Sequence, residues 1–260
     1  MIVTYDDIVK AKETQSDVIR KTSLTFSETF SNICGAKIYL KNEHEQKTGS
    51  FKIRGAYYKI KSLNENEKSK GVVAASAGNH SQGVAFASHI ENIPCTIVMP
   101  KTASPAKVAA TRGYGATVVL EGTTYDESWI YAQEIAKETN STIIHAFDDP
   151  QIITGQGVIG LEILDDLPNV DEIYVPIGGG GLVAGILIAV KEKNPNVKII
   201  GVESSAFPAM KKSFECNNLE TVDGKTTIAD GISVKTPGKL TFEIVKEKID
   251  EIVTVDDEDI

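Results

Sequence analysis

Thr48-Gly49-Ser50-Phe51-Lys52-Ile53-Arg54-Gly55-Ala56 places a lysine between an aromatic and an aliphatic residue, with glycines and small hydroxyl residues on either side. A surface lysine ordinarily has polar neighbours, because a solvated ammonium group gains nothing from apolar ones. Partial burial of Lys52 would disfavour the ammonium form and yield the free amine that a nucleophilic or Schiff-base lysine needs. The alternative is a lysine whose aliphatic stem lies along the start of a helix, and this stretch alone does not separate the two.

The composition is ordinary for a soluble globular protein, with 41% hydrophobic and 24% charged residues among 260. A net charge of −9 without any basic run argues against nucleic acid as a partner. The first residues carry acids and no cationic flank, so we expect no signal peptide. The longest apolar run, Gly181 to Val190, is too short to span a bilayer, so we expect no membrane partner.

The cysteines indicate a reducing compartment. Cys34, Cys95 and Cys216 are scattered along the chain and lack Cys-x-x-Cys spacing. Such usage indicates neither a disulfide framework nor a zinc site. We therefore expect a cytoplasmic protein without structural crosslinks.

Short apolar stretches alternate with helical patterns along the whole chain. The patterns predict strands at 37–41, 71–75, 94–100, 115–121, 142–147, 172–177, 198–203 and 251–255, and helices at 6–18, 53–63, 81–90, 105–114, 124–140, 152–167 and 182–193. Thr124 to Glu127 has the form of a capping box and marks one of these helix starts. Such alternation predicts mainly parallel β-sheet covered by helices on both faces.

A second informative stretch is Ala75-Ser76-Ala77-Gly78-Asn79-His80-Ser81-Gln82-Gly83, where a predicted buried strand gives way to a helix. The carboxyl end of a parallel strand is where open α/β sheets bind ligands. Glycine allows close approach, and the first free N–H groups of the helix attract an anion such as a carboxylate. Asn79 adds a side chain that can both donate and accept. The alternative is a structural turn with Asn79 as helix cap and His80 in a structural role.

The third stretch, Gly178-Gly179-Gly180-Gly181-Leu182, follows a predicted strand and opens an apolar helix. Four glycines without Cβ atoms can present successive backbone N–H groups to a phosphate. No Gly-Lys-Ser/Thr follows, and Val183 occupies the last glycine position of the dinucleotide fingerprint. The stretch therefore indicates a site for a single phosphate, with a merely flexible turn as the alternative.

A lysine loop, a carboxylate loop and a one-phosphate loop together suggest pyridoxal 5′-phosphate. The chain resembles the fold-type II pyridoxal-phosphate enzymes, and within them the threonine/serine dehydratase branch. The resemblance covers the chain from the first helix to about Val255 and is carried by 50–56, 75–83, Phe147-Asp148-Asp149-Pro150, Gly155-Gln156-Gly157, 178–182 and Ala229-Asp230-Gly231-Ile232-Ser233-Val234-Lys235. It implies a fold like that of the tryptophan synthase β-subunit, with two parallel-sheet α/β domains and the cofactor in the cleft between them. Residues 1–52 and 149–260 would form the large domain and 53–148 the small one.

The resemblance also implies roles for individual residues. Lys52 would carry the cofactor as a Schiff base, Phe51 would pack on its pyridine ring, and Asn79 would bond the phenolic oxygen. The residues expected to hold the phosphate are Gly178, Gly179, Gly180, Gly181 and Leu182, and those expected to line the substrate carboxylate are Ser76, Ala77, Asn79 and His80. The implied reaction is dehydration and deamination of L-threonine, and of L-serine, to 2-oxobutanoate or pyruvate and ammonia.

Rival functions remain open at this point. Serine racemases resemble Ser-Ser-Gly-Asn-His where this chain has Ser76-Ala77-Gly78-Asn79-His80, and Ala77 has no proton to give. Other β-eliminating or β-replacing enzymes of the fold, such as cysteine synthases and threonine synthases, match less well. A catalytically weak, truncated ligand-binding relative is the rival from another class. A metal site of some relatives would use Glu203, but Ala209 stands at the likely position of the second acid, so we expect no metal.

The resemblance implies further properties of the protein. The family usually forms homo-dimers or homo-tetramers, so we expect self-association, and a role in isoleucine biosynthesis is implied as well. Relatives continue past the position of Ile260, and that continuation carries the partner of the pyridine nitrogen. We therefore expect a chain shortened in this way to hold the cofactor weakly. The choice between threonine and serine is not settled, because one methyl group in an apolar pocket is worth only about 1–3 kcal/mol.

Overall fold

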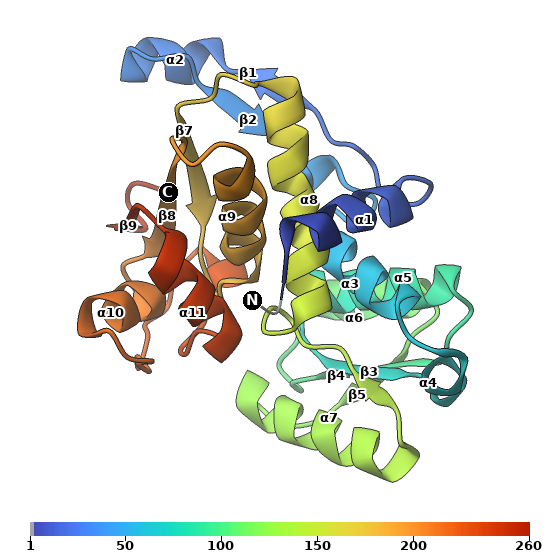
Figure 1. Ribbon diagram of the computed structural model, residues 1–260. Coiled ribbons are helices and arrows are strands. Elements are labelled where there is room, and N and C mark those ends of the chain that lie inside the picture. The colour runs from blue at the N-terminus through green and yellow to red at the C-terminus, as the bar shows by residue number, and fades with distance from the viewer. Residues whose placement is uncertain (1–2) are drawn as a thin grey trace.

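The computed structural model describes residues 3–260, which form two parallel sheets and one antiparallel ribbon (Figure 1). The four-stranded sheet has the order β5 (Thr117–Leu120), β4 (Cys95–Met99), β3 (Val72–Ala75), β6 (Thr142–Ile143), all parallel. The three-stranded sheet has the order β7 (Glu172–Pro176), β8 (Lys198–Ser204), β9 (Glu251–Val255), also parallel. The ribbon pairs β1 (Leu24–Phe26) with β2 (Tyr39–Lys41). The predicted parallel α/β fold is confirmed.

Helices separate the strands as the sequence pattern requires. They are α1 (Tyr5–Gln15), α2 (Glu28–Cys34), α3 (Lys52–Lys61), α4 (Glu65–Lys70), α5 (Asn79–Ile90), α6 (Pro105–Gly113), α7 (Tyr125–Thr139), α8 (Pro150–Asp166), α9 (Gly181–Lys193), α10 (Ala209–Cys216) and α11 (Lys239–Lys248), with short 3-10 turns η1 (Glu43–Glu45) and η2 (Asp230–Ile232). The expected capping box at the start of α7 is present, since the Thr124 side chain accepts from the N–H of Glu127 and the Glu127 carboxylate from that of Thr124.

Helix α8 is the buried centre of the molecule, with α1, α3 and α9 packed around it (Figure 1). Glycines let the backbones approach closely. A Cβ on Gly55 would lie 2.7 Å from the carbonyl oxygen of Ile152, and one on Gly155 would lie 2.7 Å from Cα of Gly55. No side chain fits at this crossing. Helix α3, which begins with Lys52, therefore packs backbone to backbone against α8.

One predicted strand is much shorter than expected. The pattern predicted a strand over 142–147, but β6 ends at Ile143. The chain turns just beyond it, because Nδ1 of His145 accepts hydrogen bonds from the N–H groups of Phe147 (3.3 Å) and Asp148 (2.8 Å). A side-chain acceptor that draws in two backbone donors withdraws them from the sheet ladder.

Candidate active site

Lys52 is the first residue of α3 and is partly buried. Its Nζ donates to the carbonyl oxygen of Ala146 at 2.9 Å and lies 5.3 Å from the centroid of the Phe51 ring. Burial lowers the pKa of Lys52 to about 8, because removal from water disfavours the ammonium form. The amine is thus held by partners inside the protein, which argues against a lysine that merely extends along a helix start.

A network of buried charges lies next to Lys52 on the same helix. Arg54 is fully buried and makes paired hydrogen bonds of 2.8–2.9 Å with the carboxylates of Glu43 and Glu162. Lys41 adds a 2.6 Å ion pair to Glu162. Bidentate guanidinium–carboxylate pairs fix the orientation of the side chains as well as their position. The network therefore ties the start of α3 to η1, to the ribbon and to α8.

The loop that was predicted to receive a carboxylate lies at the carboxyl end of β3. Gly78, not Asn79, is the N-cap of α5, and no side chain caps this helix. Asn79 is an exposed residue inside the helix, so the interpretation of Asn79 as a helix cap is wrong. Ser76 accepts from the N–H of Gly78 through its hydroxyl at 3.2 Å, and Ala77 packs against the core of the four-stranded sheet.

His80 lies on the buried side of the same helix. Its Nε2 donates to the carbonyl oxygen of Ile144 at 3.0 Å. Burial, with a smaller contribution from the nearby Lys52 charge, lowers the pKa of His80 to about 3, so the imidazole is neutral. This nitrogen is used within the fold, and a contact between His80 and a substrate carboxylate stays a prediction.

The glycine run connects the end of β7 to α9. Gly180 is the N-cap of α9 with a φ of +94°, a conformation that favours glycine. A Cβ on Gly179 would lie 2.3 Å from the ring of Phe147, so this loop can pass the ring only without a side chain. The first N–H groups of a helix have no intrahelical acceptor, which suits an anion. Because Phe147 follows the residue that accepts from Lys52, the glycine loop and the lysine lie in one site.

The segment from His145 to Asp148 connects these parts. His145 shapes the turn, Ala146 accepts from Lys52, and Phe147 packs on the glycine loop. The carboxylate of Asp148 accepts three N–H groups at the start of α11, those of Lys239 (3.0 Å), Leu240 (2.9 Å) and Thr241 (3.2 Å). Sequence analysis assigned no individual role to any of these four residues. The motif Phe147-Asp148 that carried the resemblance was the available signal.

Glu203 has a structural use in this fold. The carboxylate is buried and accepts from the backbone N–H groups of Met210 (2.9 Å) and Lys211 (2.8 Å) at the start of α10. Burial raises the pKa of Glu203 to about 7. Within residues 3–260, no group of three or more His, Cys, Asp and Glu side chains is placed to hold a metal ion. In the same part of the chain, no helix has both the length and the apolar character needed to cross a membrane.

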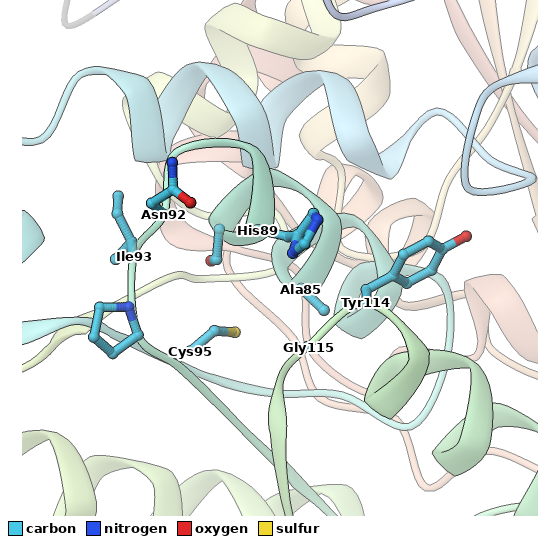
Figure 2. A pocket seen from close by; sticks show the side chains of 9 residues that line it. Ala85, His89, Asn92, Ile93, Cys95, Tyr114 and Gly115 are labelled. Carbon is cyan, nitrogen blue, oxygen red and sulfur yellow. The ribbon is translucent and has the colours of Figure 1, made fainter.

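A surface hollow of about 280 Å³ lies away from Lys52, between the carboxyl ends of α5 and α6 (Figure 2). Figure 2 shows Asn92, Ile93 and Cys95 on one side and His89 and Tyr114 on another. Cys95 is the first residue of β4, so the hollow opens at the amino end of that strand. Parallel sheets place ligand sites at the opposite, carboxyl ends. The candidate site is therefore defined by its side chains and backbone groups and not by this hollow.

Together, the fold and the site define an α/β protein with two parallel sheets, a lysine whose pKa is lowered by burial, and a glycine loop that passes close to it. The family described as pyridoxal-phosphate dependent enzyme has a model that matches residues 15–260, and the chain belongs to this family. The family's cofactor, pyridoxal 5′-phosphate, fits the site, since the Lys52 amine has a lowered pKa and the glycine loop excludes Cβ atoms.

Individual known proteins are similar over nearly the whole chain. The L-threonine ammonia-lyase of Thermotoga maritima is 51% identical over 259 residues, which cover 100% of this chain and 65% of that protein. A processed threonine deaminase isoform 2 from Solanum lycopersicum has a TM-score of 0.94 at 39% identity, with 97% and 70% of the two chains covered. A serine racemase from Dictyostelium discoideum has a TM-score of 0.93 at 38% identity, with 99% and 83% covered. The chain thus spans just under two thirds of the length of the Thermotoga relative.

We expect the Lys52 amine of the cofactor-free protein to titrate near pH 8. Below this pH the ammonium form prevails, and above it the free amine reacts, so acylation should rise as the pH passes through 8. Limited acetylation at a series of pH values, followed by digestion and mass spectrometry, measures the midpoint. Lys61 on the same helix is the matched control, because its hydrogen bond with Glu91 raises its pKa. A common midpoint for the two lysines would contradict the burial argument.

Proposed function

We propose that this protein is a pyridoxal-phosphate-dependent lyase that converts L-threonine, and L-serine, to the 2-oxo acid and ammonia. The observation that carries the proposal is the partly buried Lys52 amine, bonded to Ala146 and placed beside the glycine loop. The similarity to a threonine ammonia-lyase and a threonine deaminase supports the substrate class. Serine is included as a substrate because it differs from threonine by one methyl group, which is worth only about 1–3 kcal/mol in an apolar pocket.

Bound pyridoxal phosphate would supply an electron sink for charge that develops at the substrate Cα. The protein's own groups do the rest. Lys52 would accept the Cα proton, and its pKa of about 8 leaves a useful fraction of free amine near neutral pH. The exposed amide of Asn79 would bind the phenolic oxygen of the cofactor. The N–H groups at the start of α5 would bind the substrate carboxylate.

The glycine loop and the first residues of α9 would bind the phosphate. The groups proposed for this are the backbone N–H groups of Gly178 to Leu182, which lead into an apolar, largely buried helix. Phe51 packs partly against the core of the three-stranded sheet, and its contact with the pyridine ring belongs to the same proposal. Fixed donors of this kind act by positioning the reactants before reaction.

An assay with purified protein tests the proposed reaction. With pyridoxal phosphate and L-threonine present, we expect 2-oxobutanoate and ammonia in equal amounts, and pyruvate and ammonia from L-serine. Omission of the enzyme controls for slow chemistry of the free cofactor with amino acids. Absence of both 2-oxo acids from a protein that binds the cofactor would contradict the lyase assignment.

Racemisation of serine is the second candidate, because a serine racemase is among the similar structures. We expect L-serine to yield far more pyruvate than D-serine, since Ala77 offers no proton on the second face of the substrate. Chiral chromatography of the products measures the ratio. The Ala77→Ser variant, which adds one hydroxyl, is the matched comparison and should shift the ratio toward D-serine. Comparable amounts of D-serine and pyruvate from the unchanged protein would favour the racemase.

Four further properties belong to the proposal. The division into a large domain of residues 1–52 and 149–260 and a small domain of 53–148 is supported by the sheets, which fall in different parts of this division. Such an arrangement would allow closure on the substrate and exclusion of water. Self-association as a homo-dimer or homo-tetramer, a cytoplasmic location and a role in isoleucine biosynthesis are proposed from the family resemblance, and light scattering tests the first.

A further inference from the structure

Two groups at the start of α11 donate hydrogen bonds to one carbonyl oxygen of the glycine loop, that of Gly179. The hydroxyl of Thr241 donates to the carbonyl oxygen of Gly179 at 2.6 Å, and the N–H of Gly238 donates to the same oxygen at 3.2 Å. Thr241 is fully buried. Its hydroxyl has a single proton, and its other acceptor, the carbonyl oxygen of Gly238, is farther away at 3.1 Å. Because the Gly179 oxygen is closer, the Thr241 hydroxyl donates its proton to Gly179 and not to Gly238.

A fixed carbonyl also fixes the neighbouring N–H group. The peptide unit is planar and trans, so the carbonyl of Gly179 and the N–H of Gly180 point in opposite directions. Glycines on both sides leave this peptide free to rotate as a unit, because each can take positive or negative φ. Two donors on the Gly179 oxygen select one orientation. Because the N–H lies opposite the carbonyl, they direct the N–H of Gly180 away from α11.

Thr241 is itself held in position by neighbouring groups. Asp148 binds the N–H groups of the first residues of α11, including that of Thr241 at 3.2 Å. A Cβ on Gly180 would lie 2.8 Å from the Thr241 hydroxyl oxygen, so the threonine also lies directly against the loop. The start of α11 is thus hydrogen-bonded both to Asp148, in the turn that contacts Lys52, and to the glycine loop. A shift of this helix start away from the loop would break both sets of bonds.

We propose that Thr241 is a positioning residue for the phosphate of the cofactor, acting through the Gly179–Gly180 peptide. This inference rests on the proposed placement of pyridoxal phosphate at the glycine loop. It assigns Thr241 no contact with the substrate and no part in proton transfer. It also identifies the part of the ligand that depends on Thr241, which is the phosphate and not the aldehyde-bearing ring.

Binding of two ligands separates positioning from general packing. Pyridoxal 5′-phosphate and pyridoxal both carry the aldehyde that reacts with Lys52, but only the first has a phosphate. Dissociation constants for both are measured by absorbance titration of the unchanged protein and of Thr241→Val, which keeps the shape and removes the hydroxyl. We expect Thr241→Val to weaken pyridoxal phosphate roughly 3- to 10-fold, the usual worth of one hydrogen bond, and to leave pyridoxal unchanged.

Thr241→Ser is the matched control, because it keeps the hydroxyl and removes a methyl group. We expect this variant to retain the preference for the phosphorylated ligand, and thermal unfolding verifies that both variants are folded. Equal weakening of the two ligands by Thr241→Val would overturn the proposal in favour of general packing, and unchanged binding of pyridoxal phosphate would overturn it outright. If the unchanged protein binds both ligands equally, the glycine loop is not the phosphate site, and the cofactor placement itself fails.

Discussion

We expect Lys52→Ala to lower the turnover of L-threonine by at least about 10³-fold, since one positioned acid–base group is typically worth 10²–10⁴ and covalent attachment of the cofactor is lost as well. The fold should survive the change. Lys52 donates one hydrogen bond, to a carbonyl oxygen, and a partly buried alanine at a helix start leaves no unpaired charge. The release of ammonia and 2-oxobutanoate at saturating cofactor measures the effect.

Lys61→Ala is the matched control for this experiment. Lys61 lies on the same helix, and its side chain is exposed although it pairs with the mostly covered carboxylate of Glu91. We expect this variant to keep its activity, so that loss of a lysine from α3 is not itself the cause. Near-normal ammonia release by a folded Lys52→Ala protein would refute the proposed role, whereas loss of the native circular-dichroism spectrum would point to a structural role for Lys52.

The largest expected effect on stability is at Arg54. Replacing Arg54 by methionine leaves the carboxylates of Glu43 and Glu162 without their main partner, in a region where Arg54 itself is fully buried. Breaking a buried ion pair by removing one member typically costs about 3–5 kcal/mol, because the remaining charge is poorly solvated and loses its partner. Here Lys41 would be left, among the described residues, as the one cation for the two carboxylates. We therefore expect the free energy of unfolding of Arg54→Met, from urea titration followed by circular dichroism, to fall by about that amount.

A surface ion pair provides the comparison. Lys12 pairs with Asp165 across α1 and α8, with both side chains substantially exposed. Exposed pairs are worth about 0–1 kcal/mol, so Lys12→Ala should change the free energy of unfolding very little. If both variants lose the same amount, burial of the Arg54 network is not what stabilises the start of α3.

Much of the fold was predictable because its signals are local. Strands such as β3 and β8 are short, apolar and buried, and the capping box of α7 uses residues three positions apart. Other elements carry weak local signals. Helix α4 is entirely polar, and β1 has three residues, none of them buried. Their positions depend on neighbours distant in sequence, which a periodic pattern does not contain.

The candidate site divides in the same way. The lysine loop, the loop predicted to bind a carboxylate and the glycine loop are continuous stretches, and their residue types are the basis of the chemistry that we predict for them. The groups that hold those loops are isolated side chains whose partners are remote: Thr241 bonds to a residue 62 positions earlier, and Arg54 to one 108 positions later. In the sequence, a buried arginine cannot be distinguished from an exposed one, and only the folded structure shows its partners.

The crossing of α3 and α8 has a consequence for how this sequence can change over evolutionary time. Gly55 and Gly155 touch through their backbones, so even a methyl group at either position would force the two helices apart. Lys52 is anchored to the first of these helices. We therefore expect natural variation in α3 to be limited at a glycine that carries no functional group, and substitutions that leave the Lys52 amine intact can still be lost to selection there.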